Sequence, residues 1–464
     1  MSIGISAYGS YIPRYRVPLA QLATPSKGSR IAAGFDEDST TMAVEAARNA
    51  MSATTERPRF VYLATTSPAY VDKTNATTLH AALALGPEVL ASDLGASARS
   101  GVTALLTAAA TGGLAALADV RTGRPASADE RTGADGASAF LFSAEESEVI
   151  ARVESQASVT DEFLDRWSLP GQVGGSQWEE RFGLERYLPL ISAVSTMALD
   201  GARLSVADHV VLVSPNSGVA KRAATAVRGA LSTGGSPVGH AGAADVGLAL
   251  ARVLDVAGPE ESILVISAAD GADAFVLRTT PLLAARRQGV PVATQLAGGL
   301  DISYARYLGW RGIIDPEPPR RPDPARPAAP PSARSSAWKF ALQGSRCEVC
   351  GFLHLPPVRV CKNCGALDQI ATVSLAAEHA VGSIATFTVD RLAFSPSPPV
   401  VQVVVDFDGG GRFTFELADP EIDRLAVGAR VGLSFRSLFT AEGIHNYFWK
   451  ARMPVLVPAE STRG

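Results

Sequence analysis

The sequence contains no long apolar run. Nowhere in its 464 residues do about 18 uninterrupted apolar side chains occur, the length that a helix needs to cross a bilayer. The first residues, MSIGISAYGSYIPRYRV, do not combine a positively charged start with the roughly 7 to 15 apolar residues of a secretory signal. From these two absences we expect a cytoplasmic protein that does not associate with membranes.

The chain also has little excess charge of either sign. Its 42 lysines and arginines and 46 aspartates and glutamates leave a formal net charge of -4. This balance provides no general attraction to nucleic acid, so we expect small-molecule or protein partners instead. With 47% hydrophobic residues, a chain of this length is expected to form two or three domains.

Four cysteines are too few for a disulfide scaffold in a chain of this length. They form two C-x-x-C pairs, Cys347 with Cys350 and Cys361 with Cys364, and a glycine follows each pair. Two thiolates at this spacing reach one tetrahedral ion, and two such pairs complete a four-thiolate shell. A redox pair is the alternative, but redox motifs occur singly and beside a βαβ pattern. The spacing therefore predicts a structural zinc site.

A proline-rich segment divides the chain. Residues 316–331 contain eight prolines, which remove backbone donors and favour extended conformations. We therefore assign residues 315–337 to a linker and residues 338–370 to the zinc ribbon. The segments that follow, such as VVQVVVDFDGGGRFTFEL and IHNYFWKARM, alternate apolar and polar positions. They predict four or five strands and an OB-fold barrel over residues 371–464.

Helices and strands alternate before the linker. The segment DEDSTTMAVEAARNAM begins with the capping residues Asp38 and Ser39 and predicts a helix, and RFVYLATTS predicts a buried strand. Residues 91–120 predict the end of a strand followed by one long helix. The scheme then repeats, with HVVLVSPN as a strand, residues 220–231 and 239–256 as helices, and SILVISAADGADAFVLRTT as a strand pair. This order predicts an α/β domain with two similar halves over residues 1–314.

Several segments of this domain resemble the ordered blocks of hydroxymethylglutaryl-CoA synthase and the related ketoacyl synthase III branch of the thiolase superfamily. They are EDSTTMAVEAARNAM, TTSPAYVDKTNATTLHAALAL, SDLGASARSGVTALL, VVLVSPNSG and VGHAGAADVGLAL. The later part, WKFALQGSRCEVCGFLHLPPVRVCKNCG with SIATFTVD and NYFWKARMP, is similar to the rubredoxin-like ribbon plus OB-fold subunit that accompanies many thiolases. The resemblance implies an αβαβα layered thiolase-like fold, usually dimeric, that acts on coenzyme A thioesters.

The resemblance also points to a catalytic set that this chain lacks. The family's nucleophilic cysteine falls on Ala98, and its general-base glutamate falls on or next to Thr66. The histidine before the family's Pro-Asn pair falls on Val213, which is followed by Ser214 and Asn216. The positions Thr66, Ala98, Ser214 and Asn216 are expected to line the substrate site.

One polar group remains at a matched position. His240, in VGHAGAA, lies where relatives carry an asparagine that helps to hold a thioester oxyanion. An imidazole there donates a hydrogen bond or acts as a general acid or base, which makes His240 the candidate catalytic residue. The alternative interpretation, which the sequence supports equally, is a hydrogen-bonded histidine without a catalytic role in a degenerate site. Ser97 and Ser100 flank Ala98, but a shift of one or two residues on a helix rotates a side chain by roughly 100° or 200°, which favours capping or packing roles.

Two classes of function remain open. One is an enzyme that handles acyl-CoA without a cysteine nucleophile, by C–C bond formation or cleavage of the aldol or Claisen type or by acyl transfer, with an oxyanion hole that stabilises an enolate. The other is a non-catalytic scaffold subunit in a complex with an active, cysteine-bearing thiolase. The fused zinc and OB-fold part favours the enzyme narrowly, and the missing catalytic groups fit the scaffold as well.

Overall fold

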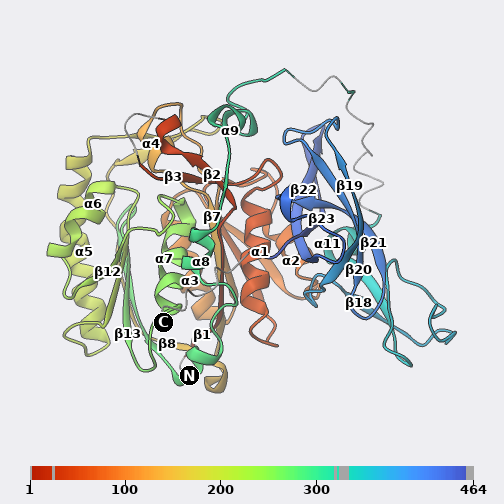
Figure 1. Cartoon of the computed structure of the whole chain (residues 1–464). Helices are drawn as coiled ribbons and strands as arrows, with labels where there is room; N and C mark the ends of the chain where they lie inside the picture. Colours follow the sequence, from red (N-terminus) through yellow and green to blue (C-terminus); the bar gives the residue numbers. More distant parts are fainter. Residues whose placement is uncertain (1–2, 23–26, 318–320, 323–333, 456–464) are drawn as a thin grey trace, which may run out of the picture. The chain divides into compact units, whose positions relative to one another are not determined.

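The computed structural model describes residues 3–22, 27–317, 321–322 and 334–455 (Figure 1). The chain separates into two units. Unit 1 comprises Met1–Ala33, Asp38–Thr77 and Pro87–Tyr304, and unit 2 comprises Gly34–Glu37, Thr78–Gly86 and Ala305–Gly464. Most of the linker predicted at residues 315–337 lies outside the described residues.

Unit 1 contains a ten-stranded sheet whose two halves have the same strand pattern. In the first half, β1 (Gly4–Tyr11), β7 (Gly136–Ser143) and β6 (Leu114–Asp119) are antiparallel in turn, and β6, β4 (Phe60–Thr65) and β5 (Leu90–Gly95) are parallel. In the second half, β8 (Ala151–Val159), β14 (Ala272–Thr279) and β13 (Ser262–Ser267) are antiparallel, and β13, β11 (His209–Val213) and β12 (Leu231–Gly234) are parallel. The repeat confirms the predicted α/β fold of two similar halves.

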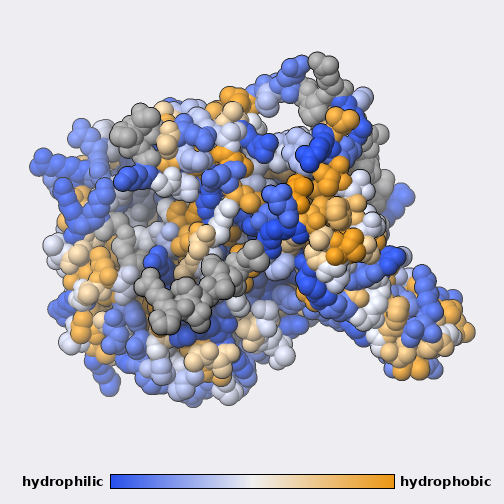
Figure 2. Space-filling model, in the orientation of Figure 1, coloured by the Kyte–Doolittle hydropathy of each residue, from blue (hydrophilic) through white to orange (hydrophobic). Residues whose placement is uncertain are grey.

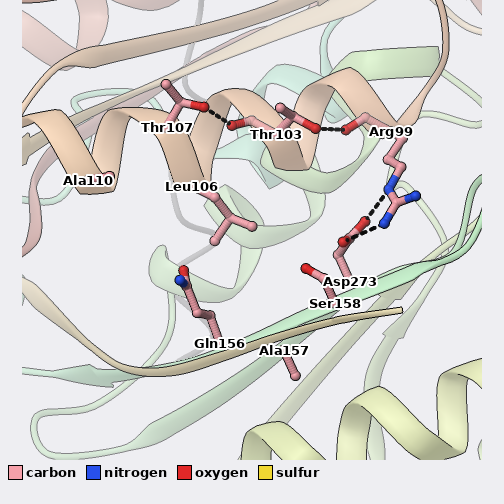
Figure 3. A pocket seen from close by; sticks show the side chains of 9 residues that line it. All are labelled: Arg99, Thr103, Leu106, Thr107, Ala110, Gln156, Ala157, Ser158 and Asp273. Carbon is pink, nitrogen blue, oxygen red and sulfur yellow. Dashed lines mark hydrogen bonds and ion pairs between the residues drawn. The ribbon is translucent and has the colours of Figure 1, made fainter. Parts of the chain in front are cut away.

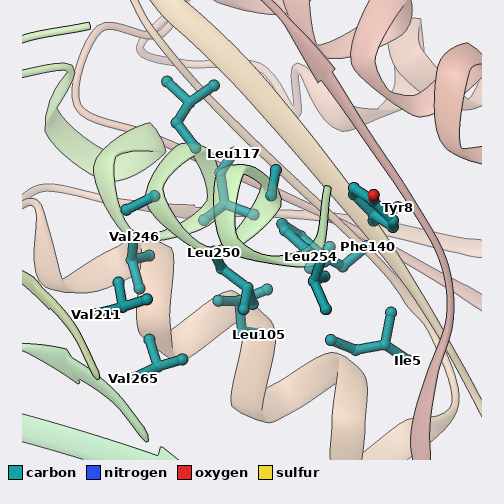
Figure 4. Close-up of a cluster of buried hydrophobic side chains, with 14 of the residues drawn as sticks. Ile5, Tyr8, Leu105, Leu117, Phe140, Val211, Val246, Leu250, Leu254 and Val265 are labelled. Atoms are coloured by element: carbon teal, nitrogen blue, oxygen red, sulfur yellow. The ribbon is translucent and has the colours of Figure 1, made fainter. Parts of the chain in front are cut away.

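Helices cover both faces of each half. The helix α1 (Ser39–Met51) packs on β1, β6 and β7, and α5 (Glu180–Gly201) packs on β8, β13 and β14. Between the two halves, α3 (Arg99–Thr111) packs against α7 (Asp245–Leu254). Figure 4 shows Leu250 and Leu254 of α7 within a core to which Phe140 and Val265 contribute from the two halves. This is the predicted αβαβα layered order.

The prediction of one long helix within residues 91–120 was wrong. The helix α3 ends at Thr111, because Gly112 adopts a φ of 70° and its N–H caps the Ala108 carbonyl. A positive φ of this kind is characteristic of the glycine that ends a helix. The residues that follow, Leu114–Asp119, form the wholly buried strand β6. The helix predicted at 220–231 is also shorter, since α6 covers Ser217–Arg222 and the segment ends in β12.

Unit 2 contains a small sheet and a closed barrel. The strands β16 (Gln343–Cys347), β17 (Leu353–His354) and β18 (Ile370–Ser374) form the three-stranded sheet. The barrel has the order β19 (Gly382–Asp390), β20 (Val400–Phe407), β21 (Arg412–Ala418), β23 (Ile444–Arg452) and β22 (Arg430–Ala441). The ribbon followed by an OB-fold barrel agrees with the expected fold class.

A buried ion cluster lies within unit 2. Arg436 is fully buried and lies 3.1 Å from carboxylate oxygens of Asp36 and Glu37 and 2.9 Å from one of Asp419. Lys450 lies 2.8 Å from Asp36. Burial raises the pKa of the Glu37 carboxyl. For Asp36, the two cations outweigh the burial and lower the pKa of its carboxyl. Removal of one charged side chain from such a cluster destabilises the folded state, because it leaves the remaining buried charges without a partner.

The described residues include no helix that is long and apolar enough to span a membrane. On the face drawn in Figure 2, hydrophilic residues are interspersed with small groups of apolar ones. The finding agrees with the absence of long apolar runs in the sequence.

Candidate functional site

Ala98 lies at the start of α3, directly after the edge strand β5. In the turn between them, Ala96 has a φ of 93°, a conformation that residues other than glycine rarely adopt. Ser97 Oγ accepts a hydrogen bond from the Arg99 N–H at 3.3 Å, and Ser100 Oγ donates to the Ser97 carbonyl at 2.7 Å. Both serine hydroxyls therefore stabilise the first helical turn, where the positive end of the helix dipole lies.

Arg99 fixes the start of α3 to the second half of the sheet. Its Nε and Nη2 donate to the two carboxylate oxygens of Asp273, at 2.9 and 3.0 Å, and Nη1 donates to the Asp270 carbonyl at 2.7 Å. This pair lies at one end of a groove of about 690 Å³ between α3 and strands β8 and β14 (Figure 3). The other lining residues are Thr103, Leu106, Thr107, Ala110, Gln156, Ala157 and Ser158. None of the predicted site residues lines this groove.

Thr66 is held by Asp119, a fully buried residue at the end of β6. Asp119 Oδ1 accepts from the Thr66 N–H at 2.7 Å and from the Ser67 N–H at 3.0 Å, and Oδ2 accepts from Thr66 Oγ1 at 3.0 Å. Arg121 Nη1 in turn donates to Thr66 Oγ1 at 2.7 Å. The hydroxyl hydrogen of Thr66 is therefore committed to the protein.

The same carboxylate also holds the loop that precedes α7. Asp119 Oδ2 accepts from the Ala243 N–H at 2.7 Å. Gly242 has a φ of 57°, and a Cβ added there would lie 2.0 Å from Asp119 Oδ2. A Cβ added to Gly101 of α3 would lie 2.1 Å from the Ala243 carbonyl oxygen. These close approaches bring the loop that contains His240 against the first turn of α3.

His240 is paired with Asp245, the first residue of α7. Nδ1 of His240 lies 2.7 Å from Asp245 Oδ2, and Asp245 Oδ1 accepts from the Ala241 N–H at 2.6 Å. The His240 side chain is 11% exposed, and its Nε2 is buried with no hydrogen-bond partner among the described residues. The sequence reasoning missed Asp245, although HAGAAD places a carboxylate five residues after the histidine, at the start of a helix.

Ser214 and Asn216 have structural partners of their own. Asn216 is fully buried and caps α6, because its Oδ1 accepts from two N–H groups of that helix at 3.0 and 3.4 Å. Its Nδ2 donates to Asp165 at 3.3 Å, and burial raises the pKa of that carboxyl. Ser214 Oγ accepts from the Asn216 N–H at 3.2 Å. Within the described residues, no hydrogen bond joins either side chain to His240.

The four cysteines of unit 2 lie together. Their sulfur atoms are all within 4.8 Å of one another, with 3.7 Å between those of Cys347 and Cys364 and 3.6 Å between those of Cys350 and Cys361. Four sulfurs placed 2.3 Å from one tetrahedral ion are about 3.8 Å apart. The cluster therefore has the dimensions of a four-thiolate metal site.

Two glycines shape the turns that carry the cysteines. Gly351 and Gly365 have φ values of 75° and 78°, and their N–H groups donate to the carbonyls of Cys347 and Cys361, at 2.9 Å each. Asn363 Nδ2 donates to Cys350 Sγ at 3.6 Å. This hydrogen bond, together with one from the backbone of Phe352, lowers the pKa of the Cys350 thiol to about 6. For Cys364, a backbone hydrogen bond at Ala366 lowers the pKa of the thiol, but hydrogen bonds with the other cysteines and burial outweigh it and raise that pKa to about 12. The spacing of the four sulfur atoms is therefore what indicates a metal site.

Unit 1 is similar in sequence to archaeal enzymes. The chain is 30% identical over 346 residues to hydroxymethylglutaryl-CoA synthase of Methanosarcina mazei, a match that covers 68% of this chain and 99% of the relative. It is also 30% identical over 343 residues to hydroxymethylglutaryl-CoA synthase of Archaeoglobus fulgidus, which covers 67% of this chain and 99% of that protein.

Solved structures show the same fold. A crystal structure of HMG-CoA synthase complexed with CoA has a TM-score of 0.57 at 16% identity, and covers 67% of this chain and 90% of that one. The 3-oxoacyl-(acyl carrier protein) synthase III of Pseudomonas aeruginosa has a TM-score of 0.52 at 21% identity, and covers 61% of this chain and 99% of that one. In unit 2, residues 379–436 match the family described as the ChsH2 C-terminal OB-fold domain.

Proposed function

The chain belongs to the hydroxymethylglutaryl-CoA synthase family, and on that premise we propose that it is an enzyme that forms or cleaves a C–C bond of an acyl-CoA without a covalent acyl-enzyme. The reaction is of the aldol or Claisen type, with His240 as the group that transfers the proton. The observation that carries the proposal is the buried, unpartnered Nε2 of His240 on a loop packed against the first turn of α3.

The sequence of unit 1 contains no cysteine that could accept an acyl group. Ala98 has a methyl group where relatives carry the nucleophile, and the hydroxyl of Ser100 donates to a backbone carbonyl. The four cysteines, which are all that the chain has, lie in one cluster of unit 2. These features support a bond-forming or bond-breaking step that occurs directly on the bound thioester.

The residues around Ala98 fit enolate chemistry. Removal of an α-proton, or cleavage of the Cα–Cβ bond, leaves negative charge on the thioester oxygen. The N-terminal turn of α3 is electropositive, and a backbone N–H or dipole at that position stabilises such an oxygen. His240 is the histidine on the adjacent loop, and an imidazole is a side chain that can serve as a general base.

Coenzyme A is the proposed carrier, in line with a relative of this fold that was solved with CoA. A second relative, the curacin HMG synthase, was solved with a donor acyl carrier protein, so a carrier-bound acyl group is the other thioester of the same chemistry. We propose a homodimer, as the thiolase-like fold implies. Leu90 at the edge strand β5 is 55% exposed and suits a contact between two copies.

Zinc is the proposed occupant of the cysteine cluster. Four thiolates in a tetrahedral arrangement leave no open position for a substrate, so Cys347, Cys350, Cys361 and Cys364 would hold the ion for structural purposes. The metal supplies folding energy to the ribbon when it is bound, and the proposed reaction does not involve it.

The proposal is tested by deuterium exchange. A base that removes the α-proton of an acyl-CoA in D₂O returns deuterium, which mass spectrometry detects in the thioester. With acetyl-CoA, propionyl-CoA and a longer acyl-CoA as probes, we expect wild-type protein to label at least one of them. In His240→Ala, the labelling rate should fall by about 100-fold or more, which is the usual effect of losing a general base. His209→Ala is the matched control, because His209 also pairs with a carboxylate, Glu261 at 2.8 Å, and should label normally.

The scaffold function is the second candidate. It is favoured by Thr66, whose hydroxyl is bound by Asp119 and Arg121 at the position of the family's general base. In that case no thioester is labelled, and the protein co-purifies with a cysteine-bearing thiolase encoded beside it. Labelling that does not depend on His240 would count against both candidates.

A further inference from the structure

The hydrogen bonds around His240 bear on which ring nitrogen carries the proton. A carboxylate in its ionised form only accepts hydrogen bonds, so the 2.7 Å contact between His240 Nδ1 and Asp245 Oδ2 fits a hydrogen on Nδ1 that is donated to Asp245. The second oxygen of Asp245 is occupied by the Ala241 N–H at 2.6 Å. The carboxylate is thereby held at both oxygens and cannot rotate away from the ring without losing a backbone partner.

The other ring nitrogen is left with a lone pair. Nε2 of His240 is buried and has no hydrogen-bond partner among the described residues. A buried polar atom without a partner is unfavourable, and a ligand that supplies the missing hydrogen bond would remove that cost. In the Nδ1–H form, Nε2 accepts a proton and cannot donate one. The neutral imidazole is therefore a base, in contrast to the oxyanion-holding asparagine of the relatives.

We propose that Asp245 is a positioning residue that fixes His240 in the Nδ1–H form, so that Nε2 is the general base for a β-hydroxyacyl thioester. This inference rests on the proposed function and adds to it the substrate class and the role of each nitrogen. Asp245 acts through His240 and does not touch the substrate.

The step balances with the groups present. Nε2 takes the proton of the β-hydroxyl, the O–H electron pair forms the new carbonyl, and the Cα–Cβ bond breaks. Its electron pair becomes the enolate of the thioester, whose oxygen lies in the electropositive field at the start of α3. The imidazolium then returns the proton to the α-carbon. The products are an aldehyde or ketone and a shortened acyl thioester, and no oxidant or reductant is consumed. In the reverse direction, Nε2 removes the α-proton first.

Main-chain hydrogen bonds hold the backbone of His240 in place for this role. The His240 N–H donates to the Thr132 carbonyl at 2.8 Å, and the Ala134 N–H donates to the His240 carbonyl at 3.0 Å. Gly239 has a φ of 109°, and a Cβ there would lie 2.8 Å from the Thr132 oxygen. These bonds hold the backbone of His240, and the contact with Asp245 holds its ring, so little entropy is lost when the substrate binds.

The first test is spectroscopic and does not depend on activity. Protein labelled with ¹⁵N-histidine is compared with His240→Gln, which identifies the signals of His240 among the six histidines. We expect a hydrogen on Nδ1 and an unprotonated Nε2. In Asp245→Asn, the amide can donate to Nδ1, and the hydrogen should move to Nε2. Glu261→Gln is the matched control, since it alters the partner of His209 and should leave His240 unchanged.

The second test is the α-deuterium exchange of an acyl-CoA. We expect Asp245→Asn to lower its rate at saturating thioester by about 100-fold or more while the KM changes little, since Asp245 orients the base and does not bind the substrate. A hydrogen on Nε2 in the wild-type protein, alone or on both nitrogens, would overturn the base assignment. Exchange that needs His240 but is unaffected in Asp245→Asn would overturn the positioning role and leave the proposed function standing. Absence of exchange in the wild type would remove the proposed function, and the ¹⁵N spectrum would still decide the tautomer.

Discussion

Asp119 joins the loop that contains Thr66 and Ser67 to the loop that contains His240 and Ala243, and its substitution is the most direct way to separate them. In Asp119→Asn, the amide oxygen is expected to stay where Oδ1 is, because four donors from Thr65, Thr66 and Ser67 converge there. In the wild type, Oδ2 accepts a hydrogen bond from the Ala243 N–H at 2.7 Å. In the variant, the NH₂ group takes the place of Oδ2 and faces that N–H, so two donors oppose each other. The variant therefore loses the link to the His240 loop and keeps most of the link to Thr66.

The magnitude follows from the bond that is lost. A hydrogen bond to a charged group contributes about 1.5–3 kcal/mol, and the Ala243 N–H becomes a buried donor without a partner. A loss of about 2 kcal/mol corresponds to an about 30-fold increase in local opening. Amide hydrogen exchange of peptides that cover residues 239–247 should rise by about this factor in Asp119→Asn.

Asp93→Asn is the matched control for this experiment. Asp93 accepts from the N–H groups of Asn75 and Ala76, at 2.7 Å each, and has no contact with the His240 loop. Its variant should show faster exchange around residue 75 and normal protection at 239–247. Unchanged protection of the His240 loop in Asp119→Asn would refute the view that this carboxylate holds the site together.

Three further predictions concern the metal, the barrel and the assembly. Purified protein should contain about one zinc per chain by elemental analysis, and Cys361→Ser should lose it; unchanged zinc would contradict the proposed site. Arg436→Leu leaves three buried carboxylates without their common partner and should destabilise unit 2 by about 3–5 kcal/mol in urea unfolding. Arg412→Leu should change little, because the Arg412 side chain, which pairs with Asp406, is 64% exposed. Sedimentation should give a dimer for the wild type and a monomer for Leu90→Arg, and a wild-type monomer would rule out the proposed assembly.

The parts of the structure that the sequence predicts well depend on local spacing. The cysteine pairs and the glycines behind them lie within a few residues of one another, so their pattern alone predicts the cluster. The strand and helix order of unit 1 follows from hydrophobic periodicity in the same way. Where the local pattern was ambiguous, the prediction failed: Leu114–Asp119 is rich in leucine and alanine, which suit a helix, but it is a strand because the sheet buries it on both faces.

The candidate site depends on contacts that no local pattern contains. Asp119 bonds residues that are 54 and 124 positions away along the chain, and only the folded sheet brings them to one carboxylate. Asp245 was within reach of a local argument, because it follows His240 by five residues. Its pairing with Nδ1 depends on the turn at Gly242, whose φ of 57° the sequence does not specify.

The central claim is that unit 1 acts on a thioester without being acylated, and one incubation in D₂O measures it. The acyl-CoA and the intact protein are weighed by mass spectrometry from the same sample. The account predicts deuterium in the thioester and no acyl group on the protein, with Ala98→Cys as the control in which a covalent adduct is expected. An acyl adduct on the wild-type protein, or a thioester that gains no deuterium, would contradict it.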